Sequence, residues 1–251
     1  MINFVGAGPG AADLITVRGK KLLEEADIII YAGSLVNPEL LNYAKRDCEI
    51  HNSASMTLEQ VIDVMKKGYR LNKKIVRLHT GDPAIYGAIR EQFDLLDELD
   101  IPYQVTPGVS SAFGAAAALC AEYTLPDVTQ TVILTRMEGR TPVPPKEEIS
   151  LLAEHQATMV IFLSTGMLQE LSERLIKGGY SENTPAAIVY KATWPEQKIV
   201  RTTVGKLAEA AEKENITKTA LITVGGFLGD KYDRSKLYAP DYSHEFREAT
   251  E

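Results

Sequence analysis

The sequence predicts an α/β protein with two domains, residues 1–118 and 119–251. The chain has 251 residues, enough for two modest domains that each bury a core. Short apolar runs that suit strands alternate with segments in which apolar residues recur at helical spacing. The clearest unit is a strand at 75–78 followed, after a turn, by a helix that we expect over residues 85–96.

The turn of this unit is Thr80-Gly81-Asp82-Pro83, and Pro83 can begin a helix. A turn between a strand and a helix lies at the carboxyl edge of a sheet, where open α/β sheets bind ligands. Gly81 lets a ligand approach the backbone, and Asp82 supplies a carboxylate. An ordinary turn with an Asx contact is the alternative interpretation. His79, just before the turn, either faces a ligand or is a structural hydrogen-bonding residue.

The rest of the first half also alternates between strand and helix. Strands are expected at 2–5, 28–31 and 103–105, which predicts a mostly parallel sheet covered on both faces. Asn37-Pro38 is typical of a helix start, and Thr57 with Gln60 forms a capping-box pattern for a helix that Gly68 would end.

The second half contains five further strand patterns and two helical segments. The proline-rich stretch 140–145 is expected to be a loop, and Pro145 could begin a helix. No structure is predicted after Gly229. The strands are expected at 131–134, 159–163, 186–189, 199–202 and 220–224, and the helices at 167–177 and 204–213.

The first strand runs into a glycine loop that imitates a dinucleotide-binding pattern. A G-x-G-x-x-G/A match can be read from Gly6, Gly8 and Ala11. Pro9, however, removes an N–H that would cradle a pyrophosphate. The strand at 28–31 is also not followed by an acid that could bind a ribose. These features disfavour a nucleotide-binding dehydrogenase, which stays an alternative.

The composition is that of an ordinary soluble globular protein, with 45% hydrophobic and 24% charged residues. A net charge of −7 without basic runs argues against broad nucleic-acid binding. Cys48 and Cys120 lie far apart, so we expect reduced thiols and no metal site. The apolar run 112–121 is too short to span a membrane, and the chain opens on a strand without a signal pattern. We therefore expect a cytoplasmic protein.

Polar side chains follow two other predicted strands. Ser110 and Ser111 lie where a helix N-terminus would present free N–H groups, and simple N-capping is the alternative. Thr165 lies in a turn at the end of the strand at 159–163, where capping of the next helix explains it equally well.

Two arginines flank a glutamate after the strand at 131–134. Arg136 and Arg140 carry guanidinium groups, which bind carboxylates in a bidentate manner. A solvated loop ion pair with Glu138 is the alternative interpretation.

Several runs resemble the tetrapyrrole methylases, a family of S-adenosylmethionine-dependent methyltransferases. The resemblance extends from the glycine loop 6–10 to Gly225-Gly226, and the glycine loop and the 80–83 turn specify only fold and cofactor. Two runs, EGRTPVP (138–144) and YKATWP (190–195), are more specific and resemble family members that methylate precorrins, with or without cobalt. The matching runs are YAGSLV (31–36), HTGDPAIYGAI (79–89), LTRMEGRTPVP (134–144) and VYKATWP (189–195).

The resemblance implies two α/β domains with S-adenosylmethionine in the cleft between them, and a homodimer. It implies that the glycine loop borders the tetrapyrrole trough. The cofactor contacts that it implies are Pro9, Gly81, Asp82, Ile85, Ser110, Ser111, Phe162, Leu163, Thr165, Ala192 and Ala220.

The substrate that the resemblance implies carries many carboxylates, so an acidic enzyme needs cationic groups to bind it. Arg136 and Arg140 are the first candidates, and Lys191 and Arg18 are weaker ones. Glu138 is the candidate general base. Methyl transfer removes positive charge from sulfur, so a carboxylate beside the sulfonium would stabilise the ground state more than the transition state. Asp82 is therefore expected to bind the amino or ribose groups.

Other functions remain open at this point. The chain could methylate another tetrapyrrole carbon, or could act on ribosomal RNA or a modified histidine as some relatives do. The net charge disfavours RNA. A metabolite sensor with the same cleft is a non-catalytic alternative.

Overall fold

The computed structural model describes residues 1–250, except for the side chain of Ser34. The chain divides into two compact units. The first unit contains Met1–Ala115 and also Lys191–Gln197, and the second contains Ala116–Tyr190 and the chain from Lys198 onward. The short segment Lys191–Gln197 is thus part of the first unit, although the residues on both sides of it in the sequence belong to the second. The predicted domain boundary between residues 118 and 119 stays a prediction.

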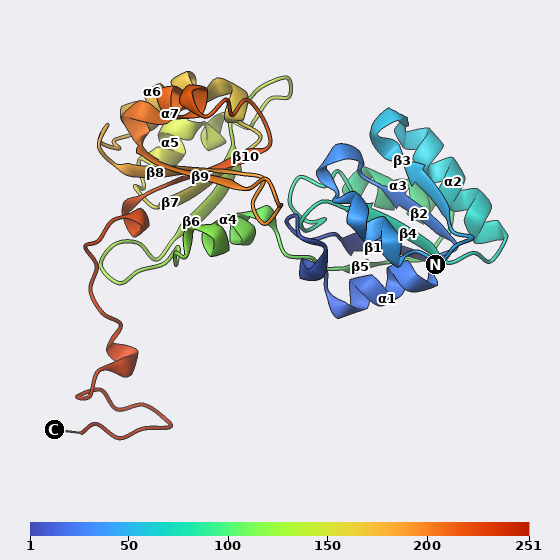
Figure 1. Cartoon of the computed structure of the whole chain (residues 1–251), viewed down its shortest axis with the longest axis horizontal. Coiled ribbons are helices and arrows are strands. Elements are labelled where there is room, and N and C mark those ends of the chain that lie inside the picture. The colour runs from blue at the N-terminus through green and yellow to red at the C-terminus, as the bar shows by residue number, and fades with distance from the viewer. Residues whose placement is uncertain (251) are drawn as a thin grey trace. The chain divides into compact units, whose positions relative to one another are not determined.

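The first unit is built on a five-stranded parallel sheet in the order β3-β2-β4-β1-β5 (Figure 1). All four neighbouring pairs are parallel, which confirms the prediction for the first half. The strands are β1 (Ile2–Gly6), β2 (Ile28–Tyr31), β3 (Glu49–Asn52), β4 (Ile75–His79) and β5 (Tyr103–Thr106), and the helices are α1 (Val17–Glu25), α2 (Leu58–Arg70) and α3 (Arg90–Glu98). The next helix, α4 (Ser111–Leu119), begins in the first unit and ends in the second.

Helices cover both faces of this sheet. Alternate residues of a strand face opposite sides. Phe4 and Ile30 therefore pack against α2 and α3, while Val5 and Ile29 pack against α1 and a 3₁₀ helix, Pro38–Tyr43. Figure 1 shows this arrangement of helices about the sheet. The strands end at a common carboxyl edge, where the polar turns lie.

The predicted start of α2 is confirmed. The Thr57 side chain accepts from the Gln60 backbone, and the Gln60 side chain accepts from the Thr57 backbone, which is a complete capping box. The predicted end at Gly68 is wrong, because the helix continues to Arg70. Gly68 is instead a packing residue: a Cβ there would lie 2.6 Å from Cδ1 of Ile28.

The helix predicted over residues 85–96 begins five residues late, at Arg90. Pro83 opens a turn rather than a helix. Tyr86 and Ala88 have positive φ angles of 55° and 48°, and such residues do not continue a right-handed helix. The chain is also tight here, since a Cβ on Gly87 would lie 2.2 Å from the Pro83 oxygen. The residues 83–89 therefore form an irregular loop directly after the Gly81-Asp82 turn.

The second unit has a five-stranded mixed sheet in the order β6-β7-β10-β8-β9. Only β6 and β7 pair in parallel, while β10 is antiparallel to β7 and β8, and β9 is antiparallel to β8. All five predicted strands are confirmed. They are β6 (Val132–Arg136), β7 (Thr158–Phe162), β8 (Pro185–Tyr190), β9 (Lys198–Thr203) and β10 (Ala220–Val224).

Three helices cover one face of the second sheet (Figure 1). They are α5 (Ile149–Ala153), α6 (Leu168–Lys177) and α7 (Leu207–Lys213). Fully buried Ile161, Ile188 and Ile222 face them from three neighbouring strands. The predicted helices at 167–177 and 204–213 correspond to α6 and α7, each preceded by a short 3₁₀ turn.

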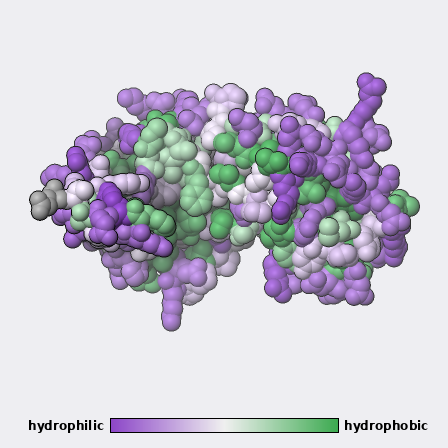
Figure 2. Space-filling model, turned by 90° about the horizontal axis from the view of Figure 1, so that it is seen from below, coloured by the Kyte–Doolittle hydropathy of each residue, from purple (hydrophilic) through white to green (hydrophobic). Residues whose placement is uncertain are grey.

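The surface is mostly hydrophilic on the face drawn in Figure 2, with hydrophobic side chains scattered among the polar ones. Within residues 1–250, no helix has the length and apolar character that crossing a membrane requires.

Candidate functional site

The carboxyl edge of the first sheet is packed unusually closely, and glycines make this possible. A Cβ on Gly6 would lie 2.5 Å from Cα of Gly108, and one on Gly108 would lie 2.2 Å from the oxygen of Gly81. These distances are shorter than Cβ contacts in proteins, so the ends of β1, β4 and β5 approach one another only because residues 6 and 108 are glycines. Packing therefore requires Gly6 and Gly108, whereas Gly81 is favoured by its positive φ of 61°.

Asp82 connects the turn after β4 to the loop after β5. Its Oδ1 accepts a hydrogen bond from the backbone N–H of Ala84 at 2.8 Å, and its Oδ2 accepts one from Gly108 at 2.9 Å. The Asx contact that was the alternative interpretation is thus present. Each carboxylate oxygen can accept a second bond, so the same group can also bind a ligand.

The serines after β5 lie at the start of α4, as expected. Ser110 is buried, and its Oγ accepts from the backbone N–H of Ala112 at 3.3 Å, so it caps the helix. Ser111 is half-buried, and its N–H and hydroxyl make no hydrogen bond within residues 1–250. Gly81 has a φ of 61°, and a Cβ there would lie 3.4 Å from the Ser111 nitrogen. Glycine at position 81 therefore keeps this donor accessible.

The glycine loop has few N–H groups to offer a phosphate. Gly8 and Gly81 exchange two backbone hydrogen bonds of 3.2 and 2.9 Å, and the Ala7 N–H donates to the backbone oxygen of His79 at 2.7 Å. The Ala11 N–H donates to Oγ1 of Thr193 at 3.0 Å. Since Pro9 has no N–H, the loop does not provide the pyrophosphate cradle of a dinucleotide-binding fold.

The carbonyl groups of the same loop are bound by side chains from distant segments. Nε1 of Trp194 donates to the Pro9 oxygen at 3.2 Å, and Nδ2 of Asn37 donates to the Gly10 oxygen at 2.9 Å. A Cβ on Gly10 would lie 2.1 Å from Cδ1 of Trp194. The segment Lys191–Gln197 is thus fitted to the glycine loop. Sequence reasoning singled out the VYKATWP run but not its contact with this loop.

Two buried polar residues, Arg77 and His79, lie on β4 just before the turn. His79 is 3% exposed, and its Nε2 has no hydrogen-bond partner within residues 1–250. Burial, with a smaller contribution from the Arg77 charge, lowers the pKa of His79 to about 3. The imidazole is therefore neutral near pH 7, and it stacks on Phe4 with ring centroids 5.9 Å apart. It is a structural residue rather than an acid or base at that pH.

Arg77 positions the loop 83–89 through Gln92. Nη1 of Arg77 donates to the Ile30 oxygen at 3.2 Å, and its Nε donates to Oε1 of Gln92 at 3.2 Å. Nε2 of Gln92 donates in turn to the oxygen of Ala88 at 2.9 Å. This chain of bonds holds the irregular loop that carries Ile85. Neither Arg77 nor Gln92 was predicted as a site residue, because a buried arginine in a strand leaves no periodic signal.

The edge of the second sheet gathers the other predicted cofactor residues. Phe162 ends β7, and Leu163 follows it with a φ of 54° and an exposed side chain. Oγ1 of Thr165 donates to the oxygen of Ala220 at 3.1 Å. The antiparallel pairing of β10 with β7 places the start of β10 beside the end of β7. These residues therefore form one local group within the second unit.

The loop after β6 folds around Arg136. Its guanidinium donates to three backbone oxygens, those of Met137 at 3.0 Å, Thr141 at 3.1 Å and Pro142 at 2.7 Å. Arg136 thus organises its own loop. Arg140 is exposed and makes no hydrogen bond or ion pair in the described chain. Of these two arginines, Arg140 has the guanidinium that is free for a ligand.

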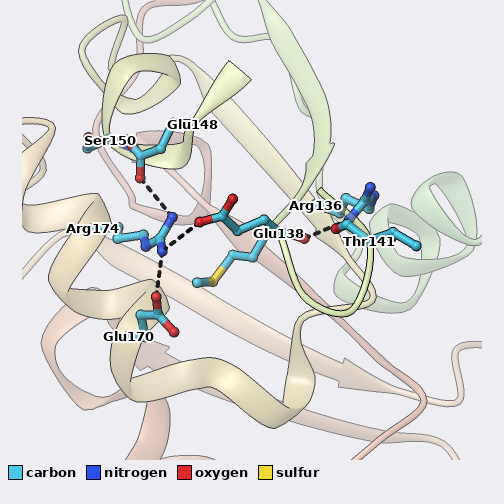
Figure 3. Close-up of polar contacts among 8 residues, drawn as sticks. Arg136, Glu138, Thr141, Glu148, Ser150, Glu170 and Arg174 are labelled. Carbon is cyan, nitrogen blue, oxygen red and sulfur yellow. Dashed lines mark hydrogen bonds and ion pairs between the residues drawn. The ribbon is translucent and has the colours of Figure 1, made fainter. Parts of the chain in front are cut away.

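Glu138 lies beside a cation of α6. Its Oε1 is 3.3 Å from Nη2 of Arg174, which also contacts Glu148 and Glu170 (Figure 3). The ion pair of Glu138 with Arg136 or Arg140, which was the alternative interpretation for those two arginines, is not formed within residues 1–250, because Glu138 pairs with Arg174 instead.

The two weaker cationic candidates lie in the first unit. Lys191 has its Nζ 3.5 Å from Oε2 of Glu196 and 5.2 Å from the ring centroid of Trp194. The Arg18 side chain is exposed on α1 and has no partner in residues 1–250.

The two sheets, with polar turns at the strand ends, define an α/β protein of the class that binds small molecules there. A family model described as Tetrapyrrole (Corrin/Porphyrin) Methylases matches residues 1–208, and the chain belongs to this family. The match confirms the resemblance predicted from the sequence.

Two similar enzymes align with nearly the whole chain. A cobalt-precorrin-4 C(11)-methyltransferase of Methanocaldococcus jannaschii is 57% identical over 99% of this chain and 96% of its own length. One from Priestia megaterium is 49% identical over 98% of this chain and 97% of its own length. The X-ray structure of a cobalamin biosynthetic enzyme, cobalt precorrin-4 methyltransferase, has a TM-score of 0.89 and 49% identity. It covers 91% of this chain and 96% of that one, which confirms the fold class.

Proposed function

We propose that the chain transfers the methyl group of S-adenosylmethionine to carbon 11 of cobalt-precorrin-4 in cobalamin biosynthesis. The observation that carries the proposal is the near-complete coverage at 57% and 49% identity by two enzymes named for this reaction. The proposal includes a homodimer, as the family resemblance implies, and a cytoplasmic location, as expected from the sequence. Metal-free precorrin-4 is the alternative substrate, because cobalt would belong to the substrate and not to the protein.

The residues at the two sheet edges fit the cofactor chemically. In the first unit, the Ser111 N–H and hydroxyl have no hydrogen-bond partner among the described residues, and Asp82 has spare acceptor capacity for amino or ribose groups. Gly81 leaves room beside the Ser111 nitrogen. The first unit would supply Pro9, Gly81, Asp82, Ile85, Ser110, Ser111 and Ala192, and the second unit Phe162, Leu163, Thr165 and Ala220.

The chain's own residues mainly align the reactants. The bound cofactor supplies an electrophilic sulfonium methyl, and an in-line displacement needs alignment and the exclusion of water more than acid or base groups. Asp82 and the Ser111 N–H would orient the donor from the first unit. A proton lost from the ring carbon can pass to solvent, and Glu138 stays the candidate base if the protein takes it.

The carboxylates of the substrate need a cation. Arg140 is the best placed of the candidate cations of the second unit, because its side chain is exposed and has no partner in residues 1–250, while Arg136 is bound to three carbonyl groups. Lys191 and Arg18 are further candidates in the first unit. A guanidinium can bind a carboxylate through two parallel hydrogen bonds.

Incubation of the purified protein with cobalt-precorrin-4 or metal-free precorrin-4 and methyl-labelled S-adenosylmethionine tests the proposal. We expect incorporation of one labelled methyl per macrocycle, with the higher kcat/KM for the cobalt form. A chain that binds the donor but methylates neither compound would refute the proposed activity. Faster methylation of uroporphyrinogen III would instead assign the chain to another reaction of the same family.

A further inference from the structure

One guanidinium contacts both ends of the loop between β6 and α5, residues 137–148. Nη2 of Arg174 lies 3.3 Å from Glu138 near the start of this β6–α5 loop, and Nη1 lies 3.1 Å from Glu148 at its end. Nη2 also lies 2.5 Å from Glu170, one turn away on α6. Figure 3 shows the three carboxylates pointing toward Arg174. The side chain of Arg174 is only 22% exposed.

The end of the loop is fixed to α5 as well as to α6. Glu148 is the N-cap of α5, and its Oε2 accepts from the backbone N–H and the hydroxyl of Ser150. Arg174 therefore joins the loop to the N-terminus of α5 and to the side of α6. An isolated exposed ion pair contributes little to stability, but one partly buried guanidinium shared by three carboxylates forms a network.

The start and the interior of the loop are ordered by separate contacts. Met137 is buried, and its N–H donates to Oγ of Ser164 at 3.0 Å. Arg136, the last residue of β6, donates to the Met137, Thr141 and Pro142 carbonyl groups of the loop. Arg140 lies between these contacts, and its guanidinium has no partner in the described part of the chain. The contacts of Arg174 and Arg136 thus leave one arginine of this loop available to a ligand.

Removing Arg174 would leave an uncompensated group of carboxylates. Glu138, Glu148 and Glu170 carry three formal negative charges, and each contacts the guanidinium of Arg174. The positive charge of Arg174 therefore offsets the repulsion among the three carboxylates. Without it, Glu138 would move away from the other two, and the start of the loop would move with it. The position of Arg140 depends on that start.

We propose that Arg174 is a positioning residue that fixes both ends of the β6–α5 loop and thereby holds Arg140 where it binds a carboxylate of the tetrapyrrole. The proposal rests on the proposed function for its ligand. It assigns to Arg174 no contact with substrate or cofactor.

The test compares Arg174→Gln, Arg174→Lys, Arg140→Gln and the double variant with the wild type. Lys67→Gln is the matched control, because Lys67 forms an exposed i,i+4 pair with Asp63 on α2. The first readout, for the variants that keep Arg140, is the rate of trypsin cleavage after Arg140 and Lys146, which reports mobility of the loop without any substrate. The others are the Kd values for uroporphyrin III, an eight-carboxylate tetrapyrrole, and for S-adenosylmethionine.

Arg174→Gln is expected to speed cleavage in the loop and to raise the Kd for uroporphyrin III by about tenfold, with the cofactor Kd unchanged. Arg174→Lys should bring the cleavage rate and the Kd for uroporphyrin III part of the way back to the wild-type values. Lys67→Gln should leave both quantities unchanged. Because Arg174 acts through Arg140, the double variant should bind uroporphyrin III no more weakly than Arg140→Gln alone.

Unchanged cleavage in Arg174→Gln would overturn the anchoring of the loop. Faster cleavage with an unchanged Kd for uroporphyrin III, or fully additive losses in the double variant, would overturn the link to Arg140. Failure of the wild type to bind the tetrapyrrole refutes the proposed function and the role of Arg140. Failure of the Arg174 proposal alone would leave wild-type binding intact, so the two failures are distinguishable.

Discussion

The indole Nε1 of Trp194 donates a hydrogen bond to the Pro9 carbonyl oxygen at 3.2 Å, although 185 positions separate the two residues. Thr193 accepts a second bond from the Ala11 N–H at 3.0 Å. The segment Lys191–Gln197, which the chain inserts between β8 and β9, is therefore part of the first unit. It stabilises the glycine loop in a form that leaves little backbone for a phosphate.

Gly10→Ala is expected to destabilise the protein by about 1–3 kcal/mol, because the added Cβ would overlap Trp194. Urea unfolding of the two proteins measures the difference. Gly166→Ala is the control, since nothing lies within 4 Å of a Cβ there, and it should change the free energy of unfolding by less than about 0.5 kcal/mol. Equal stability of the two variants would show that Trp194 does not pack on Gly10.

Trp194→Phe keeps an aromatic ring but removes the N–H that bonds Pro9. We expect a loss of about 1 kcal/mol in the free energy of unfolding, because a partly buried carbonyl loses its donor. Tyr103→Phe serves as the comparison, since it removes an exposed hydrogen bond to Asp97 and should cost less. If the two substitutions cost the same, the Trp194–Pro9 bond adds nothing beyond an ordinary surface contact.

Asp82→Asn tests whether the Asp82 carboxylate both accepts the two backbone hydrogen bonds and binds the cofactor. An amide presents an NH₂ group to one of the two backbone N–H donors, so a loss of about 1–3 kcal/mol in stability is expected. The cofactor Kd should also rise by at least about tenfold. Calorimetric titration and thermal unfolding measure the two effects. Asp94→Asn removes an exposed partner of Arg90 and is the control. An unchanged cofactor Kd would remove Asp82 from the binding site.

His79 makes stability depend on pH in one direction. Its pKa in the folded state is lowered from 6.5 to about 3, so below pH 6.5 the unfolded chain binds a proton that the folded chain does not. The contribution of His79 to the free energy of unfolding therefore decreases as the pH falls, by about 1.4 kcal/mol between pH 7.5 and 5.5.

His79→Leu removes that proton uptake and keeps an apolar contact with Phe4. The difference in free energy of unfolding between the variant and the wild type should therefore shift by about 1.4 kcal/mol in favour of the variant on going from pH 7.5 to 5.5. Urea unfolding at both pH values measures it. A constant difference would mean that His79 has the same pKa in the folded and the unfolded chain.

The α/β class and most of the strands were predictable because buried strands leave continuous apolar runs and turns leave Gly, Pro and Asp. The strand β3 was not predicted, because its residues Glu49–Asn52 are mostly polar and exposed at the edge of the sheet. The capping box at Thr57 was predictable from two residues alone. The helix over 85–96 was not, because its apolar spacing continues through Tyr86 and Ala88, whose left-handed backbone depends on the tight turn at Gly87. Periodicity cannot detect such a local constraint.

The candidate site could be predicted at the strand ends and less so elsewhere. Asp82 and Ser111 lie in the segments that come after β4 and β5, so sequence position indicates them. The roles of Arg77 and Gln92 depend on a buried bond between a strand and a helix, and that of Trp194 on a contact across 185 residues. Arg136 and Glu138 were selected by residue type, which does not distinguish a ligand-binding arginine from one that bonds its own loop.

The position of the transferred methyl group tests the central claim most directly. The protein is incubated with cobalt-precorrin-4 and S-adenosylmethionine carrying a ¹³C-methyl group, and the product is examined by NMR. The account predicts one labelled methyl, bonded to carbon 11 of the macrocycle. A label on any other carbon, or an unlabelled macrocycle in the presence of bound donor, would contradict it.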